Sequence, residues 1–321
     1  MREPRSLQEA ILYFSNLDNC VEYLAASRWP NGVVVCPICG SEKVSAFNST
    51  RRTWKCSTHH SKREFSIKVG TICEDSAIGL DKWLTAMWLL TNCKNGISSC
   101  EVARDLNVTQ KTAWFMLHRI RLALQDEFFG SKLGGEVEVD ETFIGGKARN
   151  MHLDKRERRI TGTGGKDKTV VMGILERGGK VRTTVVANRR KAGLQAQVKA
   201  HVEAGAALYT DALLSYDGLA QEYAHKVIDH AEKYVDGKVH TNGLENFWSL
   251  LKRGIAGTYV SVEPFHLFRY LDEQMFRYNN RATKERKVTD TDRFNMAVRK
   301  IFGKRVTFAE LTGKLCETSA F

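Results

Sequence analysis

Three acidic residues lie at positions from which their carboxylates can meet. Asp140 lies in the alternating stretch EVEVDETFI, Asp211 ends the short apolar run ALYTD, and Glu245 lies in the first turn of the predicted helix 242–254. Strand ends and helix starts can converge above one edge of a sheet. Carboxylates gathered there would bind hard divalent cations, because such ions prefer oxygen ligands. Two such ions can flank a phosphodiester, activate a water or a 3′-hydroxyl and stabilise the leaving oxygen.

Other interpretations of these acids remain open. Glu138 and Glu141 are rivals of Asp140: Glu138 shares its strand face, whereas Glu141 points to the other face. Asn242 and Glu245 have the N-cap-to-N3 spacing of a capping box, in which the acid ties down only the first turn of the helix. A capping role and a catalytic role for Glu245 are compatible.

Cysteine and histidine side chains, which are soft metal ligands, form a second group of candidate site residues. In CPICG, Cys36 and Cys39 are separated by two residues, and in WKCSTHH the pair Cys56 and His59 repeats that spacing. Four such ligands suit tetrahedral zinc and fill all its positions, so the ion would be structural. The pattern predicts a zinc ribbon, in which His60 can replace His59. The other cysteines lack partners at ligand spacing and are more typical of core thiols: Cys20, Cys73, Cys93, Cys100 and Cys316.

Residues 98–124 predict a helix-turn-helix, which follows a strongly apolar helix at 80–90. Ser98 and Glu101 have capping-box spacing, and Thr109 can cap the second helix. The second helix would enter the major groove of double-stranded DNA. The predicted base-side residues are Gln110, Lys111 and Thr112, and the predicted phosphate contacts are Arg119 and Arg121. An ordinary helical hairpin is the alternative.

Strands and helices alternate after the glycine-rich junction GSKLGG. The stretch 136–144 alternates apolar and acidic residues, and 168–187 predicts a hairpin that turns at 177–179. A short strand ends at Asp211 and is followed by a predicted helix, and 225–230 predicts another strand. This order is typical of a mixed α/β sheet.

Several motifs, taken in order, resemble those of a known family. They are CPICG with WKCSTHH, VEVDETFIGG, YTDALLSY, and HTNGLENFWSLLKRGIAGTY followed by HLFRYLDEQMFRYNNR. Together they resemble the insertion-sequence transposases related to eukaryotic Merlin elements, from about residue 7 to 302. The resemblance implies an RNase H-like catalytic domain with a DDE triad at Asp140, Asp211 and Glu245, and Mg²⁺ or Mn²⁺ as its cofactor.

The resemblance also implies an activity. Such an enzyme binds the terminal inverted repeats of its element, cuts there and joins the freed 3′-hydroxyls to target DNA. Because two DNA ends must be held together, we expect a homo-oligomer. Two alternatives remain: a purely hydrolytic RNase H-like nuclease, and a DNA-binding regulator made of zinc ribbon and helix-turn-helix.

Basic residues supply further candidate DNA contacts. Positions 245, 249 and 252 share one face of the predicted helix, so Lys252, with Arg253 beside it, would reach a phosphate near the acids. The alternative for Lys252 is a solvated cation that interacts with the helix dipole. The segment 147–168 is also strongly basic, and we interpret it as a mobile loop that orders on a DNA end.

Composition sets wider limits. The chain carries 49 Lys and Arg against 37 Asp and Glu, a net charge of +12, which attracts polyanions. It contains no apolar run near membrane-spanning length and no signal-peptide pattern, so we expect a cytoplasmic protein without a membrane partner. We expect four parts: an N-terminal segment with the zinc ribbon (1–75), the helix-turn-helix (76–130), the RNase H-like catalytic domain (131–302) and a C-terminal tail (303–321).

Overall fold

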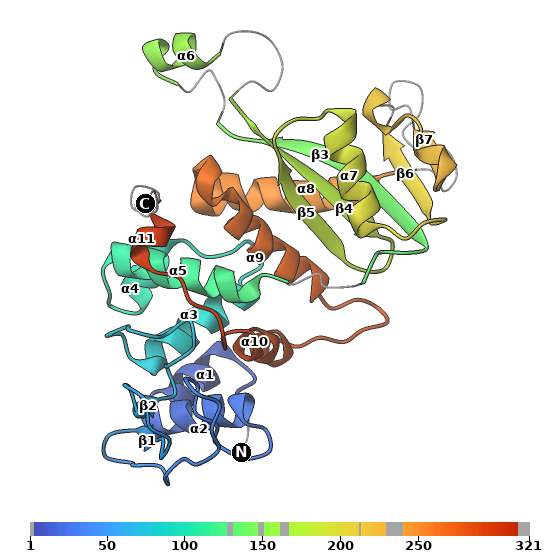
Figure 1. The fold of residues 1–321 in the computed structure, drawn as a ribbon. Helices are drawn as coiled ribbons and strands as arrows, with labels where there is room; N and C mark the ends of the chain where they lie inside the picture. The colour runs from blue at the N-terminus through green and yellow to red at the C-terminus, as the bar shows by residue number, and fades with distance from the viewer. Residues whose placement is uncertain are drawn as a thin grey trace, which may run out of the picture. The chain divides into compact units, whose positions relative to one another are not determined.

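The computed structural model describes residues 3–126, 131–146, 151–160, 167–211, 213–228 and 240–313. The chain divides into two compact units, which are treated separately below (Figure 1). The terminal unit comprises residues 1–125 and 280–321, and the central unit comprises residues 126–279. The predicted catalytic boundary at residue 302 is therefore wrong, because residues 280–302 pack into the terminal unit.

Four helices form the core of the terminal unit. They are α1 (Leu7–Phe14), α2 (Leu17–Arg28), α3 (Leu80–Asn92) and α10 (Asp290–Arg299). Phe294 of α10 is completely buried, and its ring lies 5.1 Å from Trp88, 5.7 Å from Phe14 and 5.9 Å from Tyr23, between ring centroids. Such aromatic clusters stabilise a core through large buried areas, so the late helix α10 completes a core that begins at the N-terminus.

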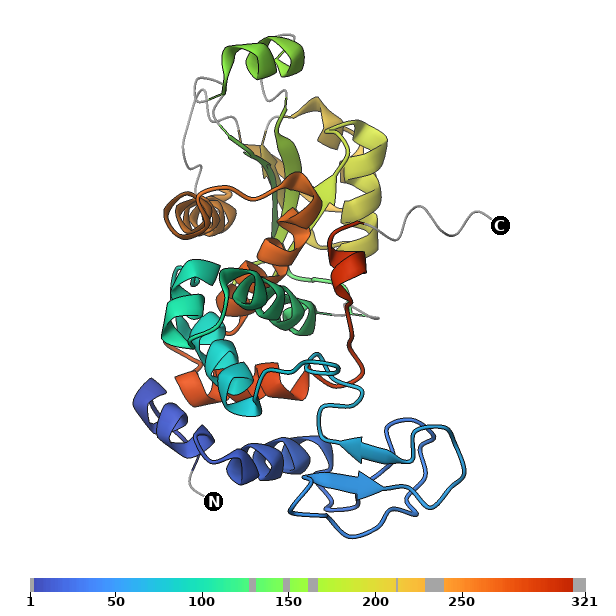
Figure 2. The same cartoon turned by 90° about the vertical axis from the view of Figure 1, so that its left-hand side faces the viewer.

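The ribbon of the terminal unit contains two short antiparallel strands, β1 (Thr53–Lys55) and β2 (Glu64–Ser66), which run side by side in Figure 2. Trp54 lies opposite Phe65 in the register, and both side chains are buried. The Trp54 ring also contacts those of Trp29 and Phe47. A small aromatic core therefore supports the segment that carries the cysteines.

The predicted helix-turn-helix forms from α4 (Ser99–Asp105) and α5 (Gln110–Leu124). Ser98 and Glu101 make the expected capping box, and Thr109 caps α5 by accepting from the Thr112 N–H. Near the C-terminus, α11 (Phe308–Leu311) places Phe308 against α5, where Lys111 lies 4.8 Å above its ring. The chain returning after α10 thus packs on the second helix of the motif.

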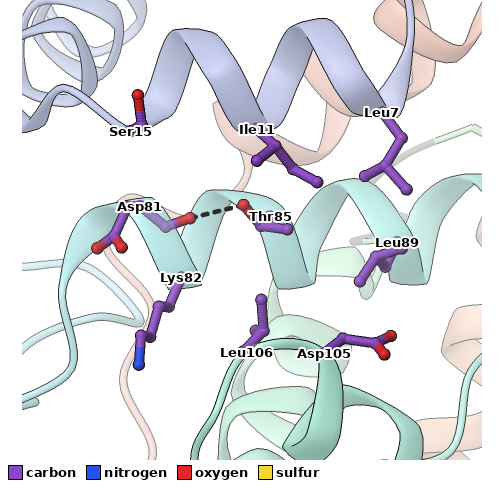
Figure 3. A pocket seen from close by; sticks show the side chains of 9 residues that line it. All are labelled: Leu7, Ile11, Ser15, Asp81, Lys82, Thr85, Leu89, Asp105 and Leu106. Carbon is purple, nitrogen blue, oxygen red and sulfur yellow. Dashed lines mark hydrogen bonds between the residues drawn. The ribbon is translucent and has the colours of Figure 1, made fainter.

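A pocket of about 320 Å³ lies in the terminal unit among α1, α3 and α4 (Figure 3). Its walls are mainly apolar and include Ile11, Leu89 and Leu106. None of its lining residues belongs to a predicted site.

The central unit is built on a five-stranded mixed sheet in the order β5-β4-β3-β6-β7. The strands are β3 (Glu136–Ile144), β4 (Thr169–Glu176), β5 (Val181–Val186), β6 (Ala207–Asp211) and β7 (Ala224–Ile228). Strands β3, β4 and β5 are antiparallel, whereas β6 pairs in parallel with both β3 and β7. This is the predicted RNase H-like mixed sheet.

Helices cover both faces of this sheet (Figures 1 and 2). On one face α7 (Lys191–His201) buries Leu194 and Val198 against Val137 and Val139. On the other face α8 (Asn242–Gly254) and α9 (Leu267–Asn279) pack on Val171, Leu175 and Val181. A further short helix, α6 (Leu153–Arg159), lies outside this arrangement.

Turns and irregular helices connect the remaining parts. The helix predicted after Asp211 is wrong: two short 3₁₀ turns, Leu214–Tyr216 and Leu219–Gln221, lie there instead. Gly218 between them adopts a φ of 93°, which an α-helix cannot accommodate. A π-helical turn, Ile255–Tyr259, extends α8, and a 3₁₀ turn, Pro264–His266, precedes α9. No helix in the described ranges is both long and apolar enough to cross a bilayer.

Candidate active site and zinc centre

Two of the predicted acids lie on neighbouring parallel strands, Asp140 within β3 and Asp211 at the end of β6. Val139 pairs with Thr210, so Asp140 of β3 and Asp211 of β6 follow at adjacent positions. Both side chains leave the sheet on the face that carries α8, because side chains alternate along a strand and the α8 residue Trp248 contacts Asp140. The sheet therefore brings these two carboxylates together on one of its faces.

Asp140 is partly buried and is held by two donors. Its Oδ1 accepts the backbone N–H of Glu141 at 2.8 Å, and its Oδ2 accepts the indole N–H of Trp248 at 3.0 Å. The pKa of Asp140 is raised to about 6: burial raises it most, the negative charges of Asp211 and Glu245 also raise it, and the two hydrogen bonds lower it. All three predicted acids therefore share one electrostatic environment.

Glu245 lies on the exposed face of the first turn of α8. The alternative role as a capping-box acid is wrong, since α8 begins at Asn242 with Thr241 as its N-cap, and the Thr241 side chain makes no capping hydrogen bond. Asp211 accepts the Leu213 N–H through Oδ1 at 3.2 Å, which fixes the turn after β6.

Glu138, one rival of Asp140, has a structural role. Its side chain is only 1% exposed, and Oε1 receives the Arg177 Nε–H at 2.9 Å. Its Oε2 accepts the backbone N–H of Leu244 at 3.0 Å, within the first turn of α8. A carboxylate at a helix N-terminus satisfies a free donor and interacts favourably with the dipole. Glu138 therefore fixes the start of the helix that carries Glu245.

Glu141, the other rival, adds negative charge beside the site from the opposite face. Its pKa is raised to about 8: burial raises it most, the charges of Asp211 and Asp140 also raise it, and Arg189 lowers it. Its Oε1 is buried without a hydrogen-bond partner. This excess of closely spaced carboxylates suits a divalent cation, which would neutralise it with the oxygen ligands that such ions prefer.

Sequence reasoning missed two residues of this site, Trp248 and Arg177. A buried indole needs an acceptor for its N–H, and Trp248 follows Glu245 by three positions. The helix spacing could therefore have indicated that Trp248 lies near the acids. Arg177 lies in the β4–β5 turn, where an arginine is expected to be solvated, and no pattern in the sequence indicates its partner Glu138.

Four soft ligands meet in the ribbon. The donor atoms of Cys36, Cys39, Cys56 and His60 all lie within 4.8 Å of one another. The Sγ atoms of Cys39 and Cys56 are 3.6 Å apart, and Cys36 Sγ lies 3.5 Å from His60 Nε2. The choice of His59 is corrected: its side chain is exposed, and His60 provides the fourth ligand atom.

Local structure prepares the first pair of cysteines. Gly40, at a φ of 73°, closes the turn after Cys39, and its N–H donates to the carbonyl of Cys36 at 2.9 Å. Burial raises the pKa of the Cys56 thiol, but hydrogen bonds with His60, Thr58 and Cys39 outweigh this and lower it to about 6. Thiolates are the form that binds zinc, so this donor set fits a closed tetrahedral zinc site.

The predicted DNA-contacting residues of α5 separate into two groups. Gln110 and Lys111 are exposed and Thr112 is partly exposed; Gln110 donates to the Ser99 hydroxyl at 2.8 Å. Arg119 and Arg121 are only 5% and 1% exposed, so their predicted phosphate contacts are wrong for this structure. Arg119 instead donates to the backbone carbonyls of Val306 and Glu74, and it supports the fold of the terminal unit.

On α8, the predicted phosphate contacts are accessible. Lys252 and Arg253 are both exposed, as are Glu245 and Ser249. One open face of α8 thus carries an acid at its start and cations at its end. The basic segment 147–168, also predicted to contact DNA, lies partly outside the described residues.

Comparisons with known proteins agree with this arrangement. Residues 132–279 match the family model of the ISXO2-like transposase domain, and residues 16–58 match that of the transposase zinc-ribbon domain. A Halobacterium salinarum protein, named as an uncharacterized protein in transposable element ISH50, is 29% identical over 246 residues, covering 73% of this chain and 81% of that protein.

A second relative is shorter. An uncharacterized transposase-like protein of Haemophilus influenzae is 33% identical over 106 residues, which cover 33% of this chain and 85% of that protein. The acids Asp140, Asp211 and Glu245 lie within residues 132–279, and the cluster cysteines Cys36, Cys39 and Cys56 lie within residues 16–58. The chain belongs to the insertion-sequence transposase family defined by an ISXO2-like transposase domain and a transposase zinc ribbon.

Proposed function

We propose that this transposase binds the terminal inverted repeats of its mobile element, cuts the DNA there and joins the freed 3′-hydroxyls to target DNA. The observation that carries the proposal is the convergence of Asp140 and Asp211 on adjacent strands with Glu245 at the start of α8; burial, and then the charges of Asp211 and Glu245, raise the pKa of Asp140. Carboxylates placed this closely repel one another unless cations lie between them. Their arrangement on one face of the sheet therefore supports a site for divalent metal.

The three acids would hold Mg²⁺ or Mn²⁺, which supplies Lewis acidity and neutralises charge on the phosphate when bound. In the first step, a water oxygen attacks phosphorus in line, and the bond to the 3′-oxygen breaks to leave a 3′-hydroxyl. In the second step, that hydroxyl attacks a target phosphate, and a new phosphodiester replaces the broken one. Exposed Lys252 and Arg253 would hold neighbouring phosphates.

The terminal unit would recognise the DNA ends. Gln110, Lys111 and Thr112 start the second helix of the helix-turn-helix, which is the part that contacts bases in such motifs. The cysteine cluster would hold a structural zinc that stabilises the ribbon. Because two ends must be joined to one target, we infer that the working form is a homo-oligomer bound to double-stranded DNA.

The first test is cleavage of DNA fragments that carry the terminal repeats flanking the coding sequence. Asp140→Asn, Asp211→Asn and Glu245→Gln keep the side-chain shape but remove a charged ligand. Because metal stabilisation contributes several kcal/mol to such reactions, we expect cleavage to fall at least ~10³-fold. Binding of the same DNA, measured by mobility shift, should stay within about a factor of three of wild type.

Asp217→Asn is the matched control, since this exposed acid lies six residues after Asp211 and should leave cleavage unchanged. Undiminished cleavage by Asp211→Asn would refute the triad. A strand-joining assay with pre-cut ends separates the transposase from a hydrolytic nuclease, which would produce no joined product. Metal-independent binding without any nicking would instead identify a regulator.

A further inference from the structure

Trp248 is a buried aromatic residue whose one polar atom points at the site. Its side chain is 4% exposed, and its Nε1–H donates to Oδ2 of Asp140 at 3.0 Å. An indole can donate a hydrogen bond but cannot accept one. The contact therefore holds Asp140 most strongly when the aspartate is ionised, which is also the state that ligates metal.

The sheet makes room for this ring at one position. Gly173 of β4 is the cross-strand partner of Asp140. A Cβ atom at Gly173 would lie 2.6 Å from Cζ2 and 2.9 Å from Cη2 of Trp248, and 2.8 Å from Cδ2 of Leu244. Real Cβ atoms are not found this close to neighbouring atoms. The indole can therefore lie beside Asp140 only because residue 173, on which it packs, is a glycine without a side chain.

The two hydrogen bonds leave Asp140 able to bind a cation. A carboxylate offers about four acceptor positions on its two oxygens, and Asp140 uses one on each oxygen, for Trp248 and for the Glu141 N–H. The terminal torsion of an aspartate is otherwise broad. With both oxygens held, the carboxylate plane is fixed while lone pairs on both oxygens remain for a metal.

Trp248 also links the acids to one another. It lies on α8 three residues after Glu245, so the two side chains leave neighbouring points of the same helix. A shift of α8 along the sheet would break the bond to Asp140. The indole thus ties the helix that carries Glu245 to the strand that carries Asp140.

We propose that Trp248, seated on Gly173, is a positioning residue that orients Asp140 for metal ligation and sets the spacing between Asp140 and Glu245. This inference rests on the proposed metal-dependent function. Partners that orient metal ligands in this way typically change metal affinity 10–100-fold when they are removed. The competing interpretation is that Trp248 only fills the core beside Phe247 and Leu244.

Trp248→Phe in the full-length protein distinguishes the two interpretations, because it keeps an aromatic ring and removes the N–H. Binding of Mn²⁺ is measured by loss of the free-ion electron paramagnetic resonance signal, with Asp140→Asn defining the part due to this site. We expect Trp248→Phe to weaken that binding about 10–100-fold. The Mg²⁺ concentration for half-maximal cleavage should rise by the same factor, and saturating metal should restore most of the rate.

Leu251→Ala is the matched control, since Leu251 is buried in the same core on the same helix but does not contact the carboxylate. It should lower the melting temperature and leave Mn²⁺ affinity unchanged. If Trp248→Phe fails to fold, replacing Trp248 by β-(3-benzothienyl)alanine keeps the shape of the ring system and exchanges N–H for sulfur. Gly173→Ala, which displaces the ring, should weaken Mn²⁺ binding as Trp248→Phe does.

Wild-type Mn²⁺ affinity in Trp248→Phe or in the benzothienyl protein would overturn this inference. That result is distinguishable from a failure of the proposed metal-dependent function itself. If the proposed function were wrong, wild type and Asp140→Asn would bind Mn²⁺ equally, and neither would cleave the DNA ends.

Discussion

At the scale of single residues, the fourth zinc ligand is the sharpest test of the ribbon. His60 Nε2 lies 3.5 Å from Cys36 Sγ, whereas the adjacent His59 is exposed. His60→Asn should therefore reduce bound zinc from about one ion per chain to a small fraction, and His59→Asn should leave it unchanged. Zinc is measured by elemental analysis of purified protein, and zinc loss in the His59→Asn protein alone would reverse the assignment.

The sequence could identify this cluster but not complete it. Two adjacent histidines follow Cys56, and the ligand spacing permits either one. Which one faces the cysteines depends on the path of the chain between β1 and β2. The places of the three acids on two strands and at the start of a helix were predictable, because they follow from strand and helix patterns.

The two buried arginines of α5 show the opposite case. Arg119 and Arg121 look like phosphate contacts because arginine is rarely buried without partners. The partners of Arg119 are backbone carbonyls of Glu74 and Val306, which lie far away in the sequence. No local pattern in α5 reveals that these acceptors are present.

At the scale of elements, the start of α8 depends on a strand. Glu138 joins Arg177 and the Leu244 N–H in a buried network, whereas Glu136 reaches the same arginine from a side chain that is 39% exposed. Glu138→Gln breaks a buried ion pair and should lower the free energy of unfolding of the central unit by about 3 kcal/mol. Glu136→Gln should cost less than about 1 kcal/mol.

Urea titration followed by circular dichroism measures both variants. End cleavage should also fall in Glu138→Gln, because the helix that carries Glu245 loses its anchor. Equal stability losses in the two variants would mean that the buried Glu138–Arg177 pair contributes no more to the free energy of unfolding than the exposed Glu136–Arg177 pair.

The element pattern was predictable where it was strongly periodic. The strand around Asp140 was predicted from its alternation and the hairpin 168–187 from two β-branched runs joined at a glycine turn, and both form. Helix α7 was not predicted, because only Leu194 and Val198 are buried along its 11 residues, which is a weak apolar stripe. The helix expected after Asp211 is replaced by 3₁₀ turns on either side of Gly218. Gly218 has a left-handed backbone conformation, which ends a helix although the apolar pattern favours one.

At the scale of the whole molecule, the terminal unit is assembled from both ends of the chain. Phe294, at 0% exposure, contacts rings from three helices that precede residue 93. Phe294→Ala should lower the free energy of unfolding of this unit by about 3–5 kcal/mol, because it leaves a cavity. Leu12→Ala, which truncates a side chain that is 67% exposed on α1 of the same unit, is the matched control and should cost little.

Scanning calorimetry measures this effect. We expect two transitions, one for each compact unit, and Phe294→Ala should lower only the transition that chelation of zinc also lowers. A parallel shift of both transitions would contradict independent folding of the two units.

The discontinuous terminal unit has a consequence for synthesis of the protein. A ribosome releases the ribbon and the helix-turn-helix first, but α10 emerges only after the whole central unit, residues 126–279, has been made. At roughly 5–20 residues per second, that interval is on the order of ten seconds. During this interval the rings of Phe14, Tyr23 and Trp88, which contact Phe294 in the folded protein, are not covered by α10. A prematurely terminated chain therefore lacks a complete core in the unit proposed to bind DNA, so such fragments would compete poorly with intact enzyme for the element's ends.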